Sequence, residues 1–284
     1  MEMVVAEDRI LVFKDTLNEE EASAIAWKNK NKAFGTINKV TNFLTRPKDE
    51  DFEVVYKEHR YQPFWHIKAK SKYVYDRTVE HQWPSTGPEV LEITLQGQNY
   101  KTRNGDVFIS VLEHCQQEES QEVFIDGLTG VKQVSLKKYL ECAVEEKNKE
   151  DFLLLAEQNI VIPPHNRGSG FVREIASKMI HSIEADKIFE ESVQFEHVDL
   201  YYRPVFAFRY HWASKNKEAV VEVNAVTGEV TYSQESFQQL MGKVLDYDFL
   251  FDIGKDAASM FIPGGSIAVK IAKKYIDVTK QRQN

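Results

Sequence analysis

The chain has few of the residues that mark common functional classes. Its 284 residues include only two cysteines, Cys115 and Cys142, and no CxxC pair. This excludes a disulfide scaffold and a four-cysteine zinc site. No run reaches the ~18 uncharged apolar residues that cross a bilayer. The first eight residues have neither the basic nor the apolar part of a signal peptide. These absences predict a cytoplasmic protein with no transmembrane segment.

The sequence also lacks the short motifs of common enzymes. It has no GxSxG, HExxH or GxGxxG, and its 13 glycines leave few backbone cradles for a nucleotide. Three aspartates recur every four residues at Asp248, Asp252 and Asp256, a spacing typical of one acidic helix edge and not of a calcium loop. The net charge of −8 argues against bulk attraction to nucleic acid. We therefore expect no catalytic residue, no cofactor and no metal.

What the sequence does contain is an internal repeat. Residues 61–68 (YQPFWHIK) match 202–209 (YRPVFAFR), and residues 123–130 (VFIDGLTG) match 221–228 (VEVNAVTG), in the same order. Such repetition predicts a duplicated supersecondary unit. The first copy has the longer spacing between its two phrases, and the extra segment, about 78–117, contains alternating apolar residues and an Asn-Gly turn. It predicts a β insert.

Alternation along the two aromatic strands divides their side chains between two faces. In the first copy Tyr61 and Trp65 fall on one face with further apolar residues, and in the second copy Phe206 and Phe208 do the same. Successive strand side chains point to opposite faces. We therefore expect the aromatic rows to be interior packing and the opposite face to be polar.

Each copy shows the pattern of a helix followed by two strands. Asn18 and Glu21 have the spacing of a capping box, and apolar residues of helical period occur at 171–182. The predicted fold class is α+β, with two tandem helix-plus-antiparallel-hairpin units. The predicted boundaries are 1–134 for the first unit with its insert, 135–170 for a helical linker, 171–234 for the second unit, and 235–284 for a helical C-terminal tail.

This arrangement resembles the PepSY type of cystatin-like α-β-β module. The resemblance is carried by the aromatic strand Tyr202-x-Pro204-Val205-Phe206-Ala207-Phe208 and by Val221-x-Val223-Asn224-Ala225-Val226-Thr227-Gly228. It covers about 60 residues of the second copy and fewer of the first. The resemblance implies a binding or regulatory module of a bacterial-type cell and carries over no catalytic residue.

The polar strand faces provide candidate binding residues. They are basic positions on the faces opposite the aromatic rows: Arg60, Lys68, Lys70, Lys72, Arg203 and Arg209. Such a row can meet the phosphates of a nucleic acid or another polyanion. However, Glu218 and Glu222 can lie across from it and neutralise part of its charge. We therefore favour a solvated sheet face.

A second candidate surface lies near the C-terminus. Ser266 can cap a helix that bears Lys270, Lys273 and Lys274, and residues 265–284 contain five basic residues and one acidic residue. A basic amphipathic helix can lie on an anionic membrane, dock on a partner, or fold back on the acidic body of its own chain. We favour the last.

The leading functional prediction is a non-catalytic binding or adaptor protein. It would engage an unidentified protein partner through the duplicated sheet surfaces and the basic tail. One alternative is a nucleic-acid or polyanion binder that uses the basic strand faces. A second alternative is a hydrolase built on His114, Cys115 and His197, which requires these three side chains to share one pocket.

Overall fold

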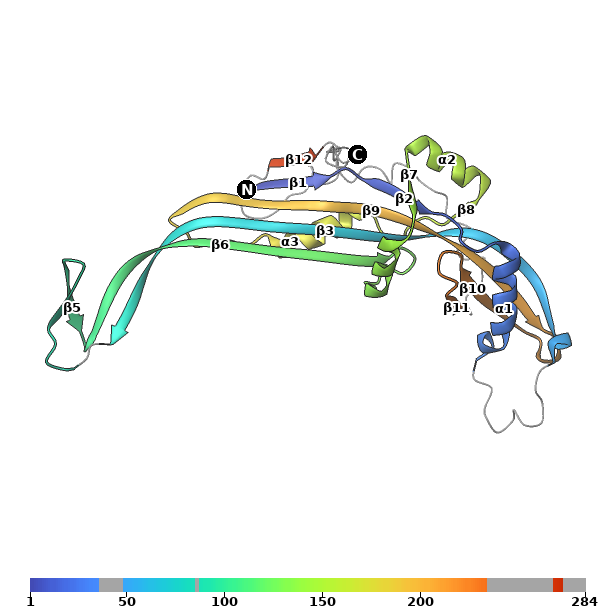
Figure 1. The fold of residues 1–284 in the computed structure, drawn as a ribbon, viewed down its shortest axis with the longest axis horizontal. Helices are drawn as coiled ribbons and strands as arrows, with labels where there is room; N and C mark the ends of the chain where they lie inside the picture. Colours follow the sequence, from blue (N-terminus) through green and yellow to red (C-terminus); the bar gives the residue numbers. More distant parts are fainter. Residues whose placement is uncertain (36–47, 85–86, 234–267, 273–284) are drawn as a thin grey trace, which may run out of the picture.

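The computed structural model describes residues 1–35, 48–84, 87–233 and 268–272, and shows an elongated molecule built along one sheet (Figure 1). The strands are β1 (Glu2–Ala6), β2 (Arg9–Phe13), β3 (Phe52–Pro84), β4 (Glu92–Leu95), β5 (Gln98–Arg103), β6 (Asp106–Asp126), β7 (Val144–Lys147), β8 (Ile160–Val161), β9 (Lys187–Trp212), β10 (Lys217–Asn224), β11 (Val230–Ser233) and β12 (Ala268–Ala272). The helices are α1 (Glu19–Ala33), α2 (Lys149–Gln158) and α3 (Gly168–Met179), with short 3-10 turns η1 (Asp49–Asp51), η2 (Val134–Glu141) and η3 (Ala213–Lys215).

Two long strands form the centre of the sheet. β3 and β9 pair antiparallel from Phe52 opposite Trp212 to Asp76 opposite Lys187. β6 continues the sheet beyond β3, and β10 and β11 continue it beyond β9. β1 and β2 add parallel to β9, and β8 adds parallel to β3. The described fold is therefore mostly β, with one large mixed sheet, and the prediction of an α+β fold made of two helix-plus-hairpin units is wrong.

The repeated segments 61–68 and 202–209 occupy equivalent places in this sheet. Gln62 lies opposite Arg203, and Tyr61 and Pro63 lie opposite Pro204 and Tyr202. Because the two segments pair antiparallel about this point, the sheet has an approximate two-fold axis here. Trp65 and Phe206 are both buried, which confirms the prediction that the aromatic rows are interior.

The two turns that close the copies make the same hydrogen bonds. Oδ1 of Asp126 accepts from the backbone N–H groups two and three residues further on, and so does Oδ1 of Asn224. Each turn then places a glycine, Gly130 or Gly228, at a φ near +70° (72° and 71°). Glycine adopts this left-handed conformation without a steric penalty.

The helices are exchanged between the copies. α1, which precedes β3, packs through Ala22 and Ala26 on the hairpin of β9 and β10. α3, which precedes β9, packs through Val172 and Ile175 in the cluster that contains side chains of β3, β9 and the end of β6. The strand before each helix also joins the other copy, since β2 pairs with β9 and β8 pairs with β3. α1 therefore lies over the hairpin of the other copy, α3 packs on the central strands of both copies, and the two copies are interlocked.

Other local predictions have mixed outcomes. The capping box of Asn18 and Glu21 is present at the start of α1, and the helix expected at 171–182 is α3. The helix expected from 135 to 158 is wrong in its first part, where η2 and β7 precede α2. Residues 268–272 of the expected helical tail form β12, parallel to β1. The rest of 235–284, including Asp248, Asp252 and Asp256, lies outside the described residues.

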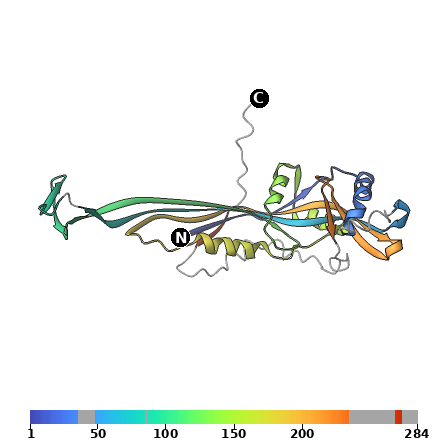
Figure 2. The same ribbon diagram turned by 90° about the horizontal axis from the view of Figure 1, so that it is seen from below.

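The predicted β insert forms an arm at one end of the molecule. β9 ends its pairing at Asp76, and β3 and β6 continue as a two-stranded ribbon to Pro84 and Asp106. β4 and β5 form a further hairpin at the tip. Figures 1 and 2 show that this arm extends away from the helices of the described chain.

Candidate functional site

The polar side chains of the central strands form one strip across the sheet. Even-numbered residues of β3 point away from the main core, because side chains alternate along a strand. On β9 the odd-numbered residues do so from His197 onward, whereas before the register shift at this point Val193 and Phe195 lie in the core. η2 covers the middle of this strip, with Leu136 and Tyr139 packed against Phe64 and Phe124. Residues beneath and beside η2 are consequently buried. This corrects the expectation that the whole strip is solvated.

A cluster of ionisable residues lies in the buried part of the strip, and we call it the His-Asp cluster (Arg9, His66, Glu122, His197 and Asp199). The strand register brings its members together, since His66 and Arg9 both lie opposite Asp199 on the strands that flank β9. Arg9 donates from Nε to Oδ1 of Asp199 at 2.8 Å and from Nη2 to Oδ2 at 2.6 Å. His66 Nε2 lies 3.0 Å from Glu122 Oε1, and His197 Nδ1 lies 3.2 Å from Asp199 Oδ2.

Burial and charge shift the pKa values in this cluster in defined directions. Burial lowers the pKa of His66 below its ordinary value, and the hydrogen bond with Glu122 only partly opposes this effect. Burial acts to raise the pKa of Asp199, but hydrogen bonds from His197 and Arg9 outweigh it and hold the pKa below the ordinary value. Burial also raises the pKa of the neighbouring Tyr201 to about 12. The cluster therefore favours a charged Asp199 beside a neutral His66.

The donor set of the cluster has the chemistry of a metal site. Ligand atoms of His66, His197 and Asp199 lie within 4.8 Å of one another, and Nδ1 of the buried His66 has no hydrogen-bond partner. Arg9 competes for this position, because its Nη2 is 2.6 Å from Asp199 Oδ2 and 3.1 Å from His197 Nδ1. A divalent cation would have to displace a guanidinium that already satisfies both carboxylate oxygens. The geometry supports a structural ion cluster better than a metal centre.

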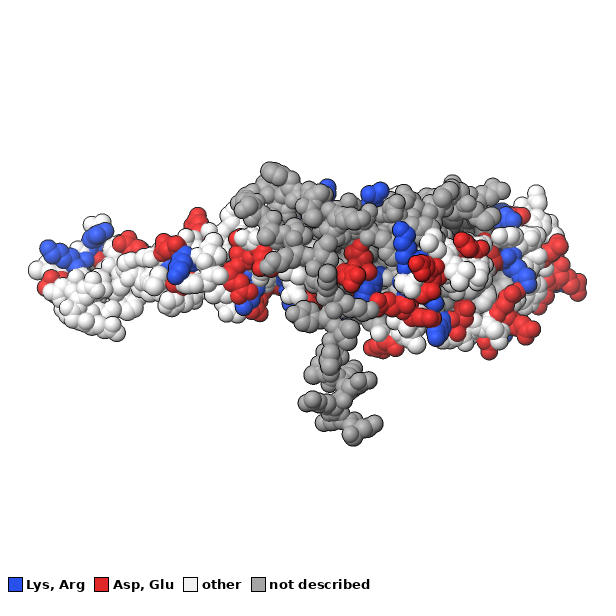
Figure 3. Space-filling view, turned by 90° about the horizontal axis from the view of Figure 1, so that it is seen from above, with Lys and Arg blue, Asp and Glu red and all other residues white. Residues whose placement is uncertain are grey.

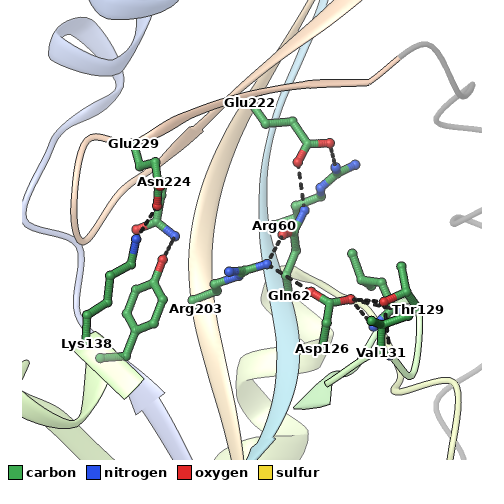
Figure 4. Close-up of polar contacts among 12 residues, drawn as sticks. Arg60, Gln62, Asp126, Thr129, Val131, Lys138, Arg203, Glu222, Asn224 and Glu229 are labelled. Carbon is green, nitrogen blue, oxygen red and sulfur yellow. Dashed lines mark hydrogen bonds and ion pairs between the residues drawn. The ribbon is translucent and has the colours of Figure 1, made fainter. Parts of the chain in front are cut away.

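A second polar network lies at the approximate two-fold axis (Figure 4). Arg203 Nη2 lies 3.3 Å from Asp126 Oδ2 and 3.4 Å from Gln62 Oε1, and Gln62 donates to Glu222 at 3.1 Å. Asn224 donates from Nδ2 to the hydroxyl oxygen of Tyr139 at 2.9 Å. The network joins both turns to the central strands. Its internal hydrogen bonds account for a structural role without a ligand.

The predicted basic row is on one face of the sheet, and its members are paired with carboxylates. Lys68 and Lys70 both contact Glu196, and Lys72 contacts Glu190 at 2.7 Å. The three arginines form four further pairs: Arg60 with Glu58 and with Glu222, Arg203 with Asp126, and Arg209 with Glu218. In Figure 3 acidic and basic side chains are interspersed over the visible part of the body. The row is therefore a mixed-charge surface and not a uniform basic one.

The candidate residues of the C-terminal segment are only partly described. Lys270 lies in β12, opposite Val4 of β1, and not on a helix. Lys273 and Lys274 lie outside the described residues. The predicted basic amphipathic helix is therefore wrong for residues 268–272, the part of this segment that the structure describes.

The structure does not bring the three hydrolase candidates together. His114 lies opposite Asp76 and is hydrogen-bonded to it at 2.6 Å, whereas His197 lies opposite Lys68. Eight residues of β3 separate these two positions, which corresponds to about 26 Å along an extended strand. Cys115 follows His114 and points to the other face. These residues do not form the single pocket that the hydrolase alternative requires.

The sequence pattern did not reveal the exposed apolar side chains of the arm. Trp83 is 53% exposed, Leu112 is 53% exposed and Leu91 is 79% exposed. The insert was predicted as β structure, but nothing in its pattern showed that the third strand would end at Asp76. The His-Asp cluster was also missed, because it depends on the register of β2 and β3 against β9, which no local pattern of the sequence indicates.

No helix in the described part of the chain is long and apolar enough to cross a membrane. No family model, curated protein or solved structure matches the chain. The resemblance to PepSY-like modules therefore stays a prediction.

Proposed function

We propose that this chain is a non-catalytic binding protein, an adaptor, and that a protein partner docks on the arm. The observation that carries the proposal is the exposure of Trp83, Leu91 and Leu112 on the arm, beyond the point where β9 ends its pairing with β3. Large apolar side chains that stay exposed on a surface are typical of protein interfaces. Tryptophan is also the residue type most enriched among interface positions that dominate binding energy.

The construction of the arm supports the same proposal. An isolated two-stranded ribbon is marginally stable in water, since neither of its faces is covered. Beyond Asp76 β3 and β6 form such a ribbon, in which Val107 and Ile109 are buried but Trp83 and Leu112 stay exposed. The hairpins at its tip turn at Gln96 and Asn104, both at positive φ. Docking of a partner would cover apolar area that the chain itself leaves exposed.

The polyanion-binding alternative has weaker support. Each described member of the basic row forms an ion pair with a carboxylate of the same sheet. A phosphate would have to compete with these carboxylates. The mixed charge of the row fits a role in holding the strands together.

The proposal is tested by removing the apolar side chains of the arm. Replacement of both Trp83→Ser and Leu112→Ser should abolish capture of the partner from the native host extract, while thermal stability changes little. The matched control is Val54→Ser with Val55→Ser, which removes two side chains that are each 40% exposed at the other end of β3. Equal loss of capture in both double variants, or no loss in the arm variant, would contradict the proposal.

The basic tail takes part in the same proposal as a second contact. A chain that ends at Ala272 keeps β12 and lacks Lys273 and Lys274. We expect this chain to capture the partner more weakly and to lose the salt dependence of binding. Unchanged capture and salt dependence would remove the tail from the proposal.

A further inference from the structure

The outer edge of β6 is open over most of its length. β6 pairs with β3 without a register shift from Asp106 to Asp126. On its other side β5 pairs only with Asp106 and Val107, and a single bridge joins Ile125 to Lys132. Between residues 108 and 122 no strand of the described chain pairs with this edge.

The backbone of this edge presents a regular row of hydrogen-bonding groups. The carbonyl oxygen of Phe124 accepts from Gln133 N, and Asp126 N donates to Val131 O, both on the side away from β3. In an antiparallel pair such outward groups recur at every second residue. The N–H and C=O groups of Ser120 and Glu118 therefore point outward as well, and so do those of the even-numbered residues before them.

The second copy shows what such an edge accepts. β10 is the counterpart of the end of β6, because Asn224 corresponds to Asp126 in the repeated turn. β11 pairs antiparallel with the outer edge of β10, with Val230 opposite Val223 and Tyr232 opposite Val221. In the first copy the chain turns away after Gln133 into η2. An edge that is filled in one half of the sheet is thus open in the other half of the described structure.

The charge of the edge restricts what can pair with it. From residue 104 to residue 131 the chain has six acidic residues and no lysine or arginine. Three of the six form ion pairs with basic side chains: Glu113 with Arg77, Glu122 with Lys137, and Asp126 with Arg203. Glu118 and Glu119 form no ion pair with a described lysine or arginine. Antiparallel pairing of two copies of β6 would place like charges opposite one another, which is unfavourable.

We propose that the edge of β6 between Leu112 and Glu122 binds an extended, lysine-rich or arginine-rich segment of a partner protein as an added antiparallel strand. Main-chain hydrogen bonds would supply affinity, and the acidic side chains would select the partner. A hollow of about 420 Å³ lies on the sheet face across β6, β3 and β9, and its lining includes Lys70 and Lys72 as well as Glu118, Glu119 and Glu190. The inference rests on the proposed protein-binding function and names the chemical class of the partner.

The test uses the full chain and a blocked, fluorescently labelled ten-residue peptide. The peptide carries lysines at the positions that would lie opposite Glu118, Glu119 and Glu122, with threonine and valine elsewhere. The key variant is Ser120→Pro, which removes one outward N–H and no hydrogen bond to β3, a position where an edge strand tolerates proline. Ser120→Ala keeps the N–H and is the matched control.

We expect the peptide to bind the native chain and Ser120→Ala alike, and to bind Ser120→Pro at least about tenfold more weakly. Glu118→Lys combined with Glu119→Lys should reduce binding to a similar extent, and added salt should weaken it. Hydrogen exchange should slow on binding at even-numbered amides of 112–122. A circular dichroism melt of Ser120→Pro that matches the native one shows that the sheet is intact.

The inference is overturned if no binding is detected, if Ser120→Pro binds as tightly as Ser120→Ala, or if protection appears at another part of the chain. The arm variant Trp83→Ser, which lies on β3 outside this edge, should still bind the peptide. Partner capture that depends on the arm together with absent peptide binding would overturn the edge inference alone. Peptide binding without capture dependent on the arm would overturn only the docking surface proposed above.

Discussion

Replacement of Arg9 by methionine is the sharpest test of the His-Asp cluster. Asp199 is 1% exposed and receives two charge-assisted hydrogen bonds from Arg9, at 2.6 and 2.8 Å. Methionine keeps most of the apolar stem and removes both donors. Breaking a buried ion pair costs about 3–5 kcal/mol, because one charge is left uncompensated. The side chain of Arg9 is itself 34% exposed, so water can partly replace it, and we expect about 2–4 kcal/mol.

The assay is urea unfolding at neutral pH, followed by tryptophan fluorescence with the buried Trp65 as a reporter. The matched control is Lys14→Met just beyond β2, since Lys14 forms an exposed pair with Glu145 at 4.0 Å. Exposed pairs contribute roughly 0–1 kcal/mol. In the Asp199→Asn background, Arg9→Met should cost less than about 1 kcal/mol, because no buried negative charge remains. Equal costs for Arg9→Met and Lys14→Met would refute the reasoning.

Two further predictions follow from the cluster and from the duplicated turns. Because the pKa of His66 is lowered in the folded state, the unfolded chain takes up a proton first as the pH falls below about 6.5, so stability should decrease from there downward and His66→Gln should flatten this slope in pH-dependent unfolding. A slope of opposite sign would contradict the assignment. Gly228→Ala should cost about 1 kcal/mol for its φ of +71°, with only an ordinary contact to Leu17, whereas Gly130→Ala should cost more because the new Cβ would lie 2.6 Å from Nδ2 of Asn166. Equal unfolding midpoints for the two glycine variants would show that this contact relaxes freely.

The sequence contained enough information to find the repeat and the interior rows. The matched phrases at Tyr61 and Tyr202 located the central strands, and alternation placed Trp65 and Phe206 inside. The capping box at Asn18 located the first turn of α1. These features are local, so they depend on residue spacing alone.

The sequence did not reveal how the copies combine. Nothing in either copy indicates that β3 and β9 pair with each other, or that α1 lies over the hairpin of the other copy, because these are choices among partners far apart in the chain. The segment after Ser135 has an apolar stripe of helical spacing, yet Val144 lies in strand β7 and pairs with Phe13 of β2. Tertiary pairing overrode the local pattern.

The C-terminal segment shows how a short apolar pattern can be assigned to the wrong period. Ile267 and Ile271 are four residues apart, which favoured a helix. Val269, Lys270 and Ile271 also alternate with period two and include two β-branched residues, which is typical of a strand. Parallel pairing with β1 stabilises the strand over the helix at these residues. The basic residues of the polar strip were likewise found in the sequence, but their carboxylate partners on β9 and β10 depend on the register.

Site-specific photo-crosslinking from the arm tests the central functional proposal most directly. A photoreactive phenylalanine analogue would replace Trp83 in one variant and Val54 in a second, in chains expressed in the native host. We expect the first variant to crosslink to a discrete protein partner and the second to give no such product. A product of the same mass from both positions, or a product from position 54 alone, would contradict the assignment of the arm as the docking surface.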